Sequence, residues 1–216
     1  MPRHAHIIFD LDGTLIDSAP AILASFSAAF AAAGRTPVRP ITDDIIGPPL
    51  TETLQLLSGS TDPATIDTLA EHFKAAYDGD GLKQTSAYPG VGDMLEQLRQ
   101  HGITLHIATN KRLAPTRKIL DLLGWRQHFD AIYALDMVTP RLPNKAAMIG
   151  RLLAEHGIAP EQAAYVGDRL EDGESASANA LPFYAATWGY GAIAPDTLRK
   201  GWVHLPTPDA RRLGCS

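Results

Sequence analysis

Two aspartates, Asp10 and Asp12, stand at the end of a short apolar segment near the start of the chain. Residues 5–9 are rich in strand formers and Gly13 interrupts the pattern, which predicts a buried strand that ends at the aspartates. Side chains two residues apart on a strand share a face, where like charges repel unless a cation, a proton or a hydrogen bond intervenes. The pair therefore indicates metal binding or proton transfer, with an ordinary Asp-Gly turn as the alternative.

A second acidic pair occurs late in the chain. Asp168 follows a predicted strand over 163–166, and Asp172 lies four residues further on in a predicted helix. Residues four apart on a helix are neighbours, so both carboxylates can face one pocket. The plainer alternative is that both stabilise the start of the helix. Two acid pairs that converge on one pocket require a cation, and oxygen ligands without a Cys/His spacing motif favour Mg²⁺.

Two further positions suit an anionic ligand. Thr109 and Asn110 follow a predicted strand over 103–108, and their hydroxyl, amide and backbone N–H groups can bind a phosphate oxygen. Lys145 begins a predicted helix, although cations are stabilised at the other end of a helix. An anionic partner would explain this position, but an exposed surface lysine is the commoner explanation.

The elements that must hold these residues alternate between strand and helix after residue 88. Strands are predicted at 103–108, 131–135, 163–166, 183–187 and near Val203, with helices at 91–101, 115–123, 145–156, 170–180 and a short one from Pro195. This alternation predicts an α/β fold, a Rossmann-like parallel sheet that has helices on both faces and includes the first strand. The carboxyl ends of its strands would then gather the polar residues at one edge.

Residues 18–82 show a different pattern of predicted elements. Only helical patterns occur there, over 20–33, near Thr42, after Pro49, and from Asp62 as an N-cap. The sequence therefore predicts two domains. Residues 1–17 and 83–216 form the Rossmann-like core, and residues 18–82 form an all-helical domain inserted after the first strand.

Composition narrows the class of protein. The chain has 216 residues, of which 45% are hydrophobic, and a net charge of -5, which fits a globular protein and disfavours nucleic-acid binding. We expect no signal peptide and no membrane span. The single cysteine, Cys215, cannot form an internal disulfide, so we expect a cytoplasmic protein. His4 and His6 have the spacing of metal ligands, but they precede the carboxyl end of the strand, and we expect an incidental surface pair.

The order of these motifs along the chain resembles the haloacid dehalogenase-like (HAD) phosphohydrolase superfamily. The four motifs match as Asp10-Leu-Asp-Gly-Thr14, Thr109-Asn-Lys111, Lys145 and Gly167-Asp-Arg-Leu-Glu-Asp172. The helical insert resembles the cap of that family. Residues 46–50, 88–91 and 188–191 look like its phosphoglycolate-phosphatase-like branch. One departure is that proline precedes Lys145 here, whereas many members carry a proline-rich stretch after the lysine.

The resemblance implies a role for each motif residue. Asp10 would attack phosphorus and form an aspartyl-phosphate, and Asp12 would protonate the leaving alcohol and then activate water. The remaining implied contacts fall into two sets. The phosphoryl group would be bound by Thr109, Asn110 and Lys145, with Gly47 of the cap also at the substrate. The Mg²⁺ would be bound by Asp10, the backbone carbonyl of Asp12, Asp168 and, directly or through water, Asp172.

The expected protein is thus a magnesium-dependent phosphatase acting on a small phosphorylated metabolite. Phosphoglycolate leads within the resemblance, followed by a nucleotide, a sugar phosphate or pyrophosphate. A phosphomutase on the same site is an alternative, and a binding or regulatory protein without catalysis is the alternative from another class. A dehalogenase is disfavoured because that chemistry does not need Asp12. We expect a monomer or a homodimer, with no nucleic-acid or membrane partner.

Overall fold

A computed structural model describes residues 3–191, 193–194 and 197–214. Cys215, and Pro195 at the start of the predicted short helix, lie outside the described residues. Within them, six strands form one sheet in the order β5-β4-β1-β6-β7-β8. Their bounds are β1 His6–Phe9, β4 Thr104–Thr109, β5 Phe129–Ala134, β6 Ala163–Gly167, β7 Phe183–Ala186 and β8 Val203–Leu205. Neighbouring strands are parallel throughout, so the predicted α/β fold is confirmed.

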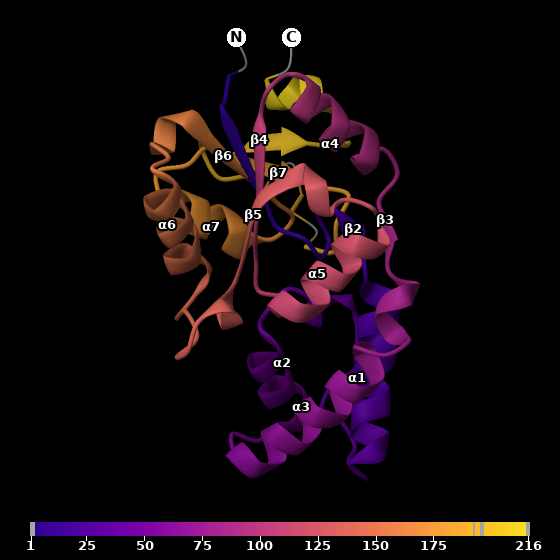
Figure 1. Ribbon diagram of the computed structural model, residues 1–216. Helices are drawn as coiled ribbons and strands as arrows, with labels where there is room; N and C mark the ends of the chain where they lie inside the picture. The colour runs from indigo at the N-terminus through magenta and orange to yellow at the C-terminus, as the bar shows by residue number, and fades with distance from the viewer. Residues whose placement is uncertain (1–2, 192, 195–196, 215–216) are drawn as a thin grey trace. The chain divides into compact units, whose positions relative to one another are not determined.

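Helices cover both faces of this sheet (Figure 1). Their bounds are α4 Val91–Gln100, α5 Leu113–Leu122, α6 Lys145–His156 and α7 Leu170–Ala178. Helices α6 and α7 lie on one side of the sheet, and α4 and α5 lie on the other. From β4 to β7, each connection between successive parallel strands passes through a helix, as a parallel sheet requires.

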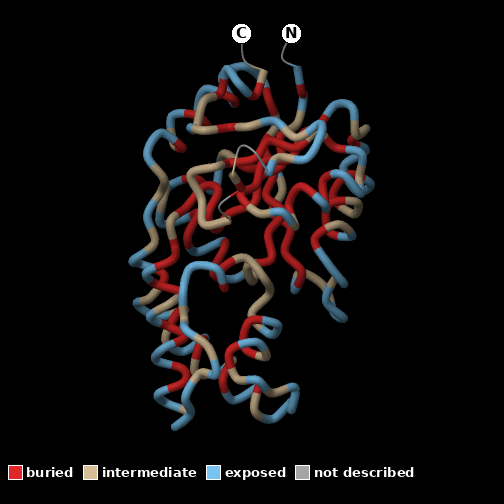
Figure 2. The backbone as a smooth tube through the Cα atoms, turned by 180° about the vertical axis from the view of Figure 1, so that it is seen from behind, coloured by how far each residue is buried: buried red, intermediate tan, exposed pale blue. Residues whose placement is uncertain are grey.

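The central strand β1 is buried on both sides, which fixes the position of the acidic residues that follow it. Ile8 packs with Met148 and Leu152 of α6 on one face, while Ile7 and Phe9 point to the other face and are fully buried. Figure 2 colours the chain by the burial of each residue and shows buried residues concentrated in the interior, with exposed residues along the outside. An apolar strand of this kind is typical of a parallel sheet with both faces covered.

The predicted helical insert is a unit of its own. The chain divides into two compact units, residues 1–16 with 87–216 and residues 17–86. The second unit contains α1 Ala19–Ala32, α2 Leu50–Ser58 and α3 Pro63–Tyr77. Asp62 caps α3 by accepting a hydrogen bond from the Thr65 N–H. The function of this unit as a cap over the active site stays a prediction.

Two features of these elements differ from the predictions. The helix expected near Thr42 is only a 3₁₀ turn, η1 Asp43–Ile45, because Gly47 and Pro48 follow at once and a helix cannot continue through them. In addition, two short strands were not predicted, β2 Ile16–Asp17 and β3 Ser86–Ala87. They pair with each other where the chain passes between the units.

The expectation that His4 and His6 lie at the surface is wrong for His4. His4 is buried and its Nε2 lies 3.0 Å from the Tyr184 hydroxyl, while His6 Nδ1 lies 3.2 Å from Nε2 of His106 on β4. The two rings of His6 and His106 stack. His6 thus contacts the neighbouring strand β4, whereas His4 contacts Tyr184 of β7, which lies two strands from β1 in the sheet. Spacing along the sequence does not reveal either contact.

Candidate active site

Asp10 leaves the sheet directly after β1. Its N–H donates to the Val166 carbonyl of β6, so the backbone at Asp10 is still hydrogen-bonded to the neighbouring strand. This bond fixes the position from which the carboxylate projects. The chain then turns at Gly13, whose φ is +81°. A Cβ there would come within 2.3 Å of the Asp168 carboxylate. Glycine is needed for both reasons, since it adopts a positive φ without strain and leaves room for the second acid.

Asp168 and Asp172 reach the same place from β6 and α7. The Gly191 N–H donates to Asp168 Oδ2 at 2.9 Å, and the Thr14 hydroxyl lies 3.4 Å from Oδ1. Asp172 Oδ2 accepts from the Arg169 N–H at 3.0 Å at the beginning of α7. The alternative that Asp172 stabilises the helix start is therefore true of one of its oxygens, and the other is left for the site.

Lys145 is the first residue of α6 and is 1% exposed. Its Nζ lies 2.5 Å from Asp172 Oδ1 and 3.2 Å from Asp10 Oδ1. Burial alone would lower the pKa of Lys145, but the carboxylates of Asp10 and Asp172 raise this pKa well above its ordinary value. The lysine is therefore a charged group in the interior, and the alternative of an exposed surface lysine is excluded.

A single ammonium cannot balance three buried carboxylates. Burial, followed by repulsion from Asp172 and Asp12, raises the pKa of Asp10 to about 7, although Lys145 opposes the rise. Burial and the charges of Asp172 and Asp10 raise the pKa of Asp168 to about 8. Each shift means that the charged form is disfavoured. Further positive charge would offset the repulsion among these carboxylates.

The donor set fits a divalent cation. One oxygen each from Asp10, Asp168 and Asp172 lie within 4.8 Å of one another. Although Lys145 is close, Asp10 Oδ1 has no hydrogen-bond partner among the described residues, so a buried acceptor is available. Both oxygens of Asp172 already accept bonds, which favours direct contact by Asp10 and Asp168 and contact through water by Asp172. Carboxylate oxygens suit Mg²⁺.

Thr109 and Asn110 lie at the end of β4, beside β1 in the sheet. Thr109 is 1% exposed, and its hydroxyl hydrogen-bonds Asp10 and accepts from the Lys111 N–H at 3.2 Å. The Asn110 amide donates to both carboxylate oxygens of Glu171, at 3.2 and 3.3 Å. Glu171, which adjoins Asp172 in the sequence, therefore holds the Asn110 amide in place.

Asp12 points to a different partner from the other three aspartates. Lys111 Nζ lies 3.0 Å from Asp12 Oδ1 and 3.3 Å from Oδ2. Asp12 does not belong to the group of carboxylates that could hold a metal ion. The structure thus separates one acid from the three that gather around Lys145.

Comparison with known proteins agrees with this arrangement. Residues 7–186 match the family model described as haloacid dehalogenase-like hydrolase. This chain belongs to that family. The haloacid dehalogenase-like match spans β1 to β7 and so includes every residue of the acidic cluster.

Three relatives show how varied the named activities are. The chain is 36% identical to the tyrosine-protein kinase PtkA of Mycobacterium tuberculosis over 86% of its own length, but it spans only 62% of that relative. A solved structure of PtkA is 33% identical with a TM-score of 0.81, covering 99% of each chain. A 5'-nucleotidase of Pseudomonas aeruginosa is 32% identical over 95% of this chain and 90% of its own. A phosphoglycolate phosphatase of Xylella fastidiosa is 35% identical over 85% and 80%.

Seven of the eight site residues predicted from the sequence lie in the unit formed by residues 1–16 and 87–216. Asp10, Asp168, Asp172 and Lys145 are brought together directly, with Thr109 and Asn110 on the neighbouring strand end. Gly47 lies in the other unit, with a φ of +114°, and its contact with substrate stays a prediction. The roles of all eight in catalysis likewise stay predictions.

The contact of Lys111 with Asp12 was missed from the sequence, although Lys111 directly follows Asn110 in the same motif. The aromatic-glycine stretch 188–191 was also missed as a part of the site. Trp188 Nε1–H donates to the Thr14 carbonyl at 3.0 Å, and a Cβ on Gly189 would lie 2.0 Å from the Gly13 carbonyl oxygen. The glycines let this loop press against the turn after Asp12.

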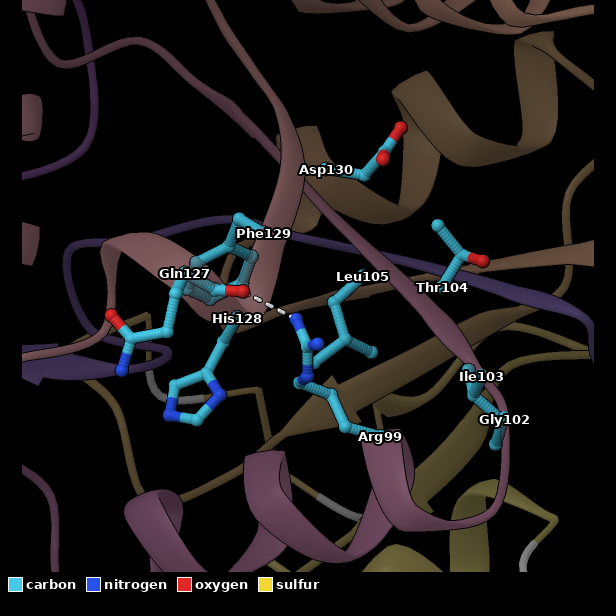
Figure 3. A pocket seen from close by; sticks show the side chains of 9 residues that line it. All are labelled: Arg99, Gly102, Ile103, Thr104, Leu105, Gln127, His128, Phe129 and Asp130. Atoms are coloured by element: carbon cyan, nitrogen blue, oxygen red, sulfur yellow. Dashed lines mark hydrogen bonds between the residues drawn. The ribbon is translucent and has the colours of Figure 1, made fainter.

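A cavity of about 500 Å³ lies away from these residues (Figure 3). It is lined near the amino ends of β4 and β5 by Arg99, Thr104, His128 and Asp130, among others. The Arg99 guanidinium donates to the Gln127 carbonyl across it. Ligands of open α/β sheets bind at the carboxyl ends of the strands, so the acidic cluster remains the candidate site.

No helix within the described residues is long and apolar enough to cross a membrane.

Proposed function

We propose that this protein is a magnesium-dependent phosphatase that hydrolyses a small phosphomonoester through an aspartyl-phosphate on Asp10. The observation that carries the proposal is the cluster at the strand ends. Asp10 Oδ1 is buried without a hydrogen-bond partner among the described residues, beside a charged lysine and two further acids. Buried carboxylates gathered in this way suit phosphoryl transfer, in which positioning and charge stabilisation provide most of the catalysis.

Asp10 is the proposed nucleophile. Its attack on phosphorus forms the bond to the phosphoryl group and releases the leaving alcohol. Lys145 and the Thr109 hydroxyl both contact Asp10, so both can bind phosphoryl oxygens as the group arrives. A Mg²⁺ held by Asp10 and Asp168 would neutralise charge on the phosphoryl oxygens.

Asp12 is the proposed acid and base. Its carboxylate lies outside the group of three that could hold a metal, so a proton on Asp12 would not compete with direct metal contact by this side chain. It would donate that proton to the leaving oxygen and then take one from the water that hydrolyses the intermediate. A phosphorylated metabolite with phosphoglycolate as first choice is the proposed substrate, supported by the names of several relatives.

The test is a phosphatase assay with Mg²⁺ over a panel of phosphoglycolate, nucleoside monophosphates, sugar phosphates and pyrophosphate. Asp10→Asn should abolish turnover without unfolding the protein, because the amide is nearly isosteric but is not a nucleophile. Mass spectrometry must show that the Asn has not deamidated. Near-normal turnover by such a preparation would remove Asp10 from this role, and activity in excess chelator would remove the metal.

A second candidate, supported only by the likeness to PtkA, is transfer of the phosphoryl group to a tyrosine side chain. The same aspartyl-phosphate could pass its phosphoryl group to an alcohol in place of water. Mass spectrometry of the protein and of a tyrosine-containing peptide after incubation with a phosphoryl donor separates the two. Release of inorganic phosphate alone supports the phosphatase.

A further inference from the structure

Lys111 has no part in the proposed chemistry, yet it lies next to a residue that does. It follows β4 by two residues, and its N–H donates to the Thr109 hydroxyl at 3.2 Å, which fixes the backbone. Its ammonium lies 3.0 and 3.3 Å from the two oxygens of Asp12. The side chain of Lys111 is 6% exposed and that of Asp12 is 10% exposed, so this ion pair is largely shielded from water.

The two lysines of the site serve different ends of the reaction. Lys145 Nζ lies 3.2 Å from Asp10 Oδ1, beside the atom that would attack phosphorus. Lys111 Nζ lies beside Asp12, which would give its proton to the leaving oxygen. Lys145 is thus the cation on the phosphoryl side, and Lys111 is a cation on the leaving-group side.

The distance from Lys111 to the leaving oxygen follows from these contacts. An oxygen that receives a hydrogen bond from Asp12 lies about 2.5–3.0 Å from it. Because Lys111 Nζ is 3.0 Å from Asp12, the ammonium lies within roughly 6 Å of the leaving oxygen. A carboxylate joined to the same carbon as the ester oxygen extends about 3 Å further, since each bond is about 1.2–1.5 Å long. A substrate carboxylate at that distance from the ester oxygen can reach ion-pair distance from the Lys111 ammonium.

Charge adds a reason for such a contact. Asp10, Asp12, Asp168 and Asp172 make the site strongly acidic, and Glu171 lies beside Asn110. An anionic leaving group would be repelled there without a cation at its side. Both oxygens of Asp12 now face Lys111, and one of them must turn to the leaving oxygen for proton transfer. A substrate carboxylate that binds Lys111 replaces the contact that Asp12 gives up.

We propose that Lys111 binds a carboxylate carried by the leaving group and thereby selects small phosphorylated hydroxy acids over phosphomonoesters with neutral leaving groups. This inference rests on the proposed phosphatase function, which it extends by assigning a substrate class and the residue that recognises it. Lys111 is a specificity-determining residue that touches substrate, distinct from Lys145 at the nucleophile.

The experiment compares two substrates of similar size, phosphoglycolate and hydroxyethyl phosphate, which differ in the carboxylate. The measured quantity is the ratio of their kcat/KM values with Mg²⁺. A hydrogen bond to a charged group corresponds to roughly 10- to 100-fold in rate, so Lys111→Gln should lower the ratio by about that factor. Any loss through Asp12 affects both substrates and cancels in the ratio. Lys111→Arg should retain most of the preference because it keeps the charge.

Lys118→Gln is the matched control, since Lys118 is an exposed lysine on α5 and should leave the ratio unchanged. Thermal unfolding of each variant checks that the fold is intact. Binding to Asp10→Asn protein, with and without Lys111→Gln, repeats the comparison without turnover and should show tighter binding of phosphoglycolate only when Lys111 is present.

The outcomes separate the two proposals. A ratio that Lys111→Gln leaves unchanged, or Asp10→Asn protein that binds the two esters equally, overturns the role of Lys111 while the phosphatase activity stands. Folded, Mg²⁺-loaded wild-type protein that hydrolyses no phosphomonoester defeats the proposed function. A drop in the ratio that Lys111→Arg restores supports the inference.

Discussion

Lys145 Nζ lies 2.5 Å from Asp172 Oδ1, an ion pair in which the side chains are 1% and 0% exposed. A buried pair of this kind is weak support for stability as a whole, but removing one partner leaves an uncompensated charge. The pair joins the first residue of α6 to the first turn of α7 and so connects two helices of the same face.

Lys145→Met should therefore destabilise the metal-free protein by about 3–5 kcal/mol. Asp172→Asn alone should also be costly, because the ammonium loses its closest partner. The double variant should be less destabilised than the sum of the two, since the remaining charge is removed as well. Urea unfolding in chelator measures all three, and Arg199→Met, at an exposed ion pair with Glu174, is the control expected to change little. Additive effects would mean that the two side chains do not interact.

Mg²⁺ should stabilise the protein more at high pH than at low pH. The pKa values of Asp10 and Asp168 are raised to about 7 and about 8, so between about pH 4 and pH 8 the metal-free folded state binds more protons than the unfolded state. Its free energy of unfolding therefore falls as pH rises through this window. A cation that replaces these protons prevents this decrease in the free energy of unfolding. The stabilisation by Mg²⁺ therefore increases with pH.

The measurement is the melting temperature in chelator and in Mg²⁺ at pH 6, 7 and 8. Asp168→Asn should lose most of the gain because it removes a ligand. Asp93→Asn, a carboxylate in the first turn of α4 and outside the acidic cluster, should keep it. A gain that is the same at every pH would contradict the protonation of the cluster.

Features of the site that depend on local sequence patterns could be predicted, whereas contacts between residues far apart in the sequence could not. The strand ends that carry Asp10, Thr109 and Asp168 followed from local apolar patterns and from the rule that parallel strands share a functional edge. The Lys111–Asp12 pair joins residues 99 apart in the sequence. The motif Thr109-Asn-Lys111 includes this lysine, but no local pattern indicates Asp12 as its partner, so the pair became visible only in the folded chain.

The surroundings of His106 and His156 also depend on pairing between strands that the sequence does not reveal. Between Leu105 and His106 the register of β4 with β5 shifts, so that Phe129 and Ala131 take successive partners and Asp130 is the extra residue. A bulge of this kind re-aims side chains, and Asp130 Oδ2 lies 3.7 Å from His156 Nδ1. A register shift depends on pairing between distant strands, which periodicity does not show.

His106 should make the protein sensitive to acid. Burial, then repulsion from His6 and His156, lowers the pKa of His106 to about 4, so the folded state keeps the ring neutral. The unfolded chain binds a proton below its ordinary pKa near 6.5, and stability is lost as pH falls from about 6.5 to 4. The difference corresponds to about 3 kcal/mol. His106→Gln should flatten this part of the pH profile in urea unfolding, whereas His101→Gln, on an exposed residue, should not. An unchanged profile in the His106 variant would place the acid sensitivity elsewhere.

Asp12 should matter most when the leaving group is poor. An alkyl phosphate leaves as a strongly basic alkoxide and needs a proton, whereas nitrophenyl phosphate leaves as a stabilised phenolate and needs it less. General acid catalysis contributes roughly 10²–10⁴-fold, so Asp12→Asn should cost the alkyl ester most of that factor in the first step. Hydrolysis of the intermediate also uses Asp12, as a base, and both substrates should lose rate there.

The discriminating measurement is the rate of aspartyl-phosphate formation in single turnover, for wild type and Asp12→Asn with each ester. Both esters should carry neutral alcohols, so that the proposed contact between Lys111 and a carboxylate does not enter; ethyl phosphate and nitrophenyl phosphate meet this condition. A loss confined to ethyl phosphate identifies Asp12 as the proton donor. Equal losses for the two would mean that Asp12 acts instead by holding Lys111, whose ammonium lies 3.0 Å from it, or by supporting the turn at Gly13.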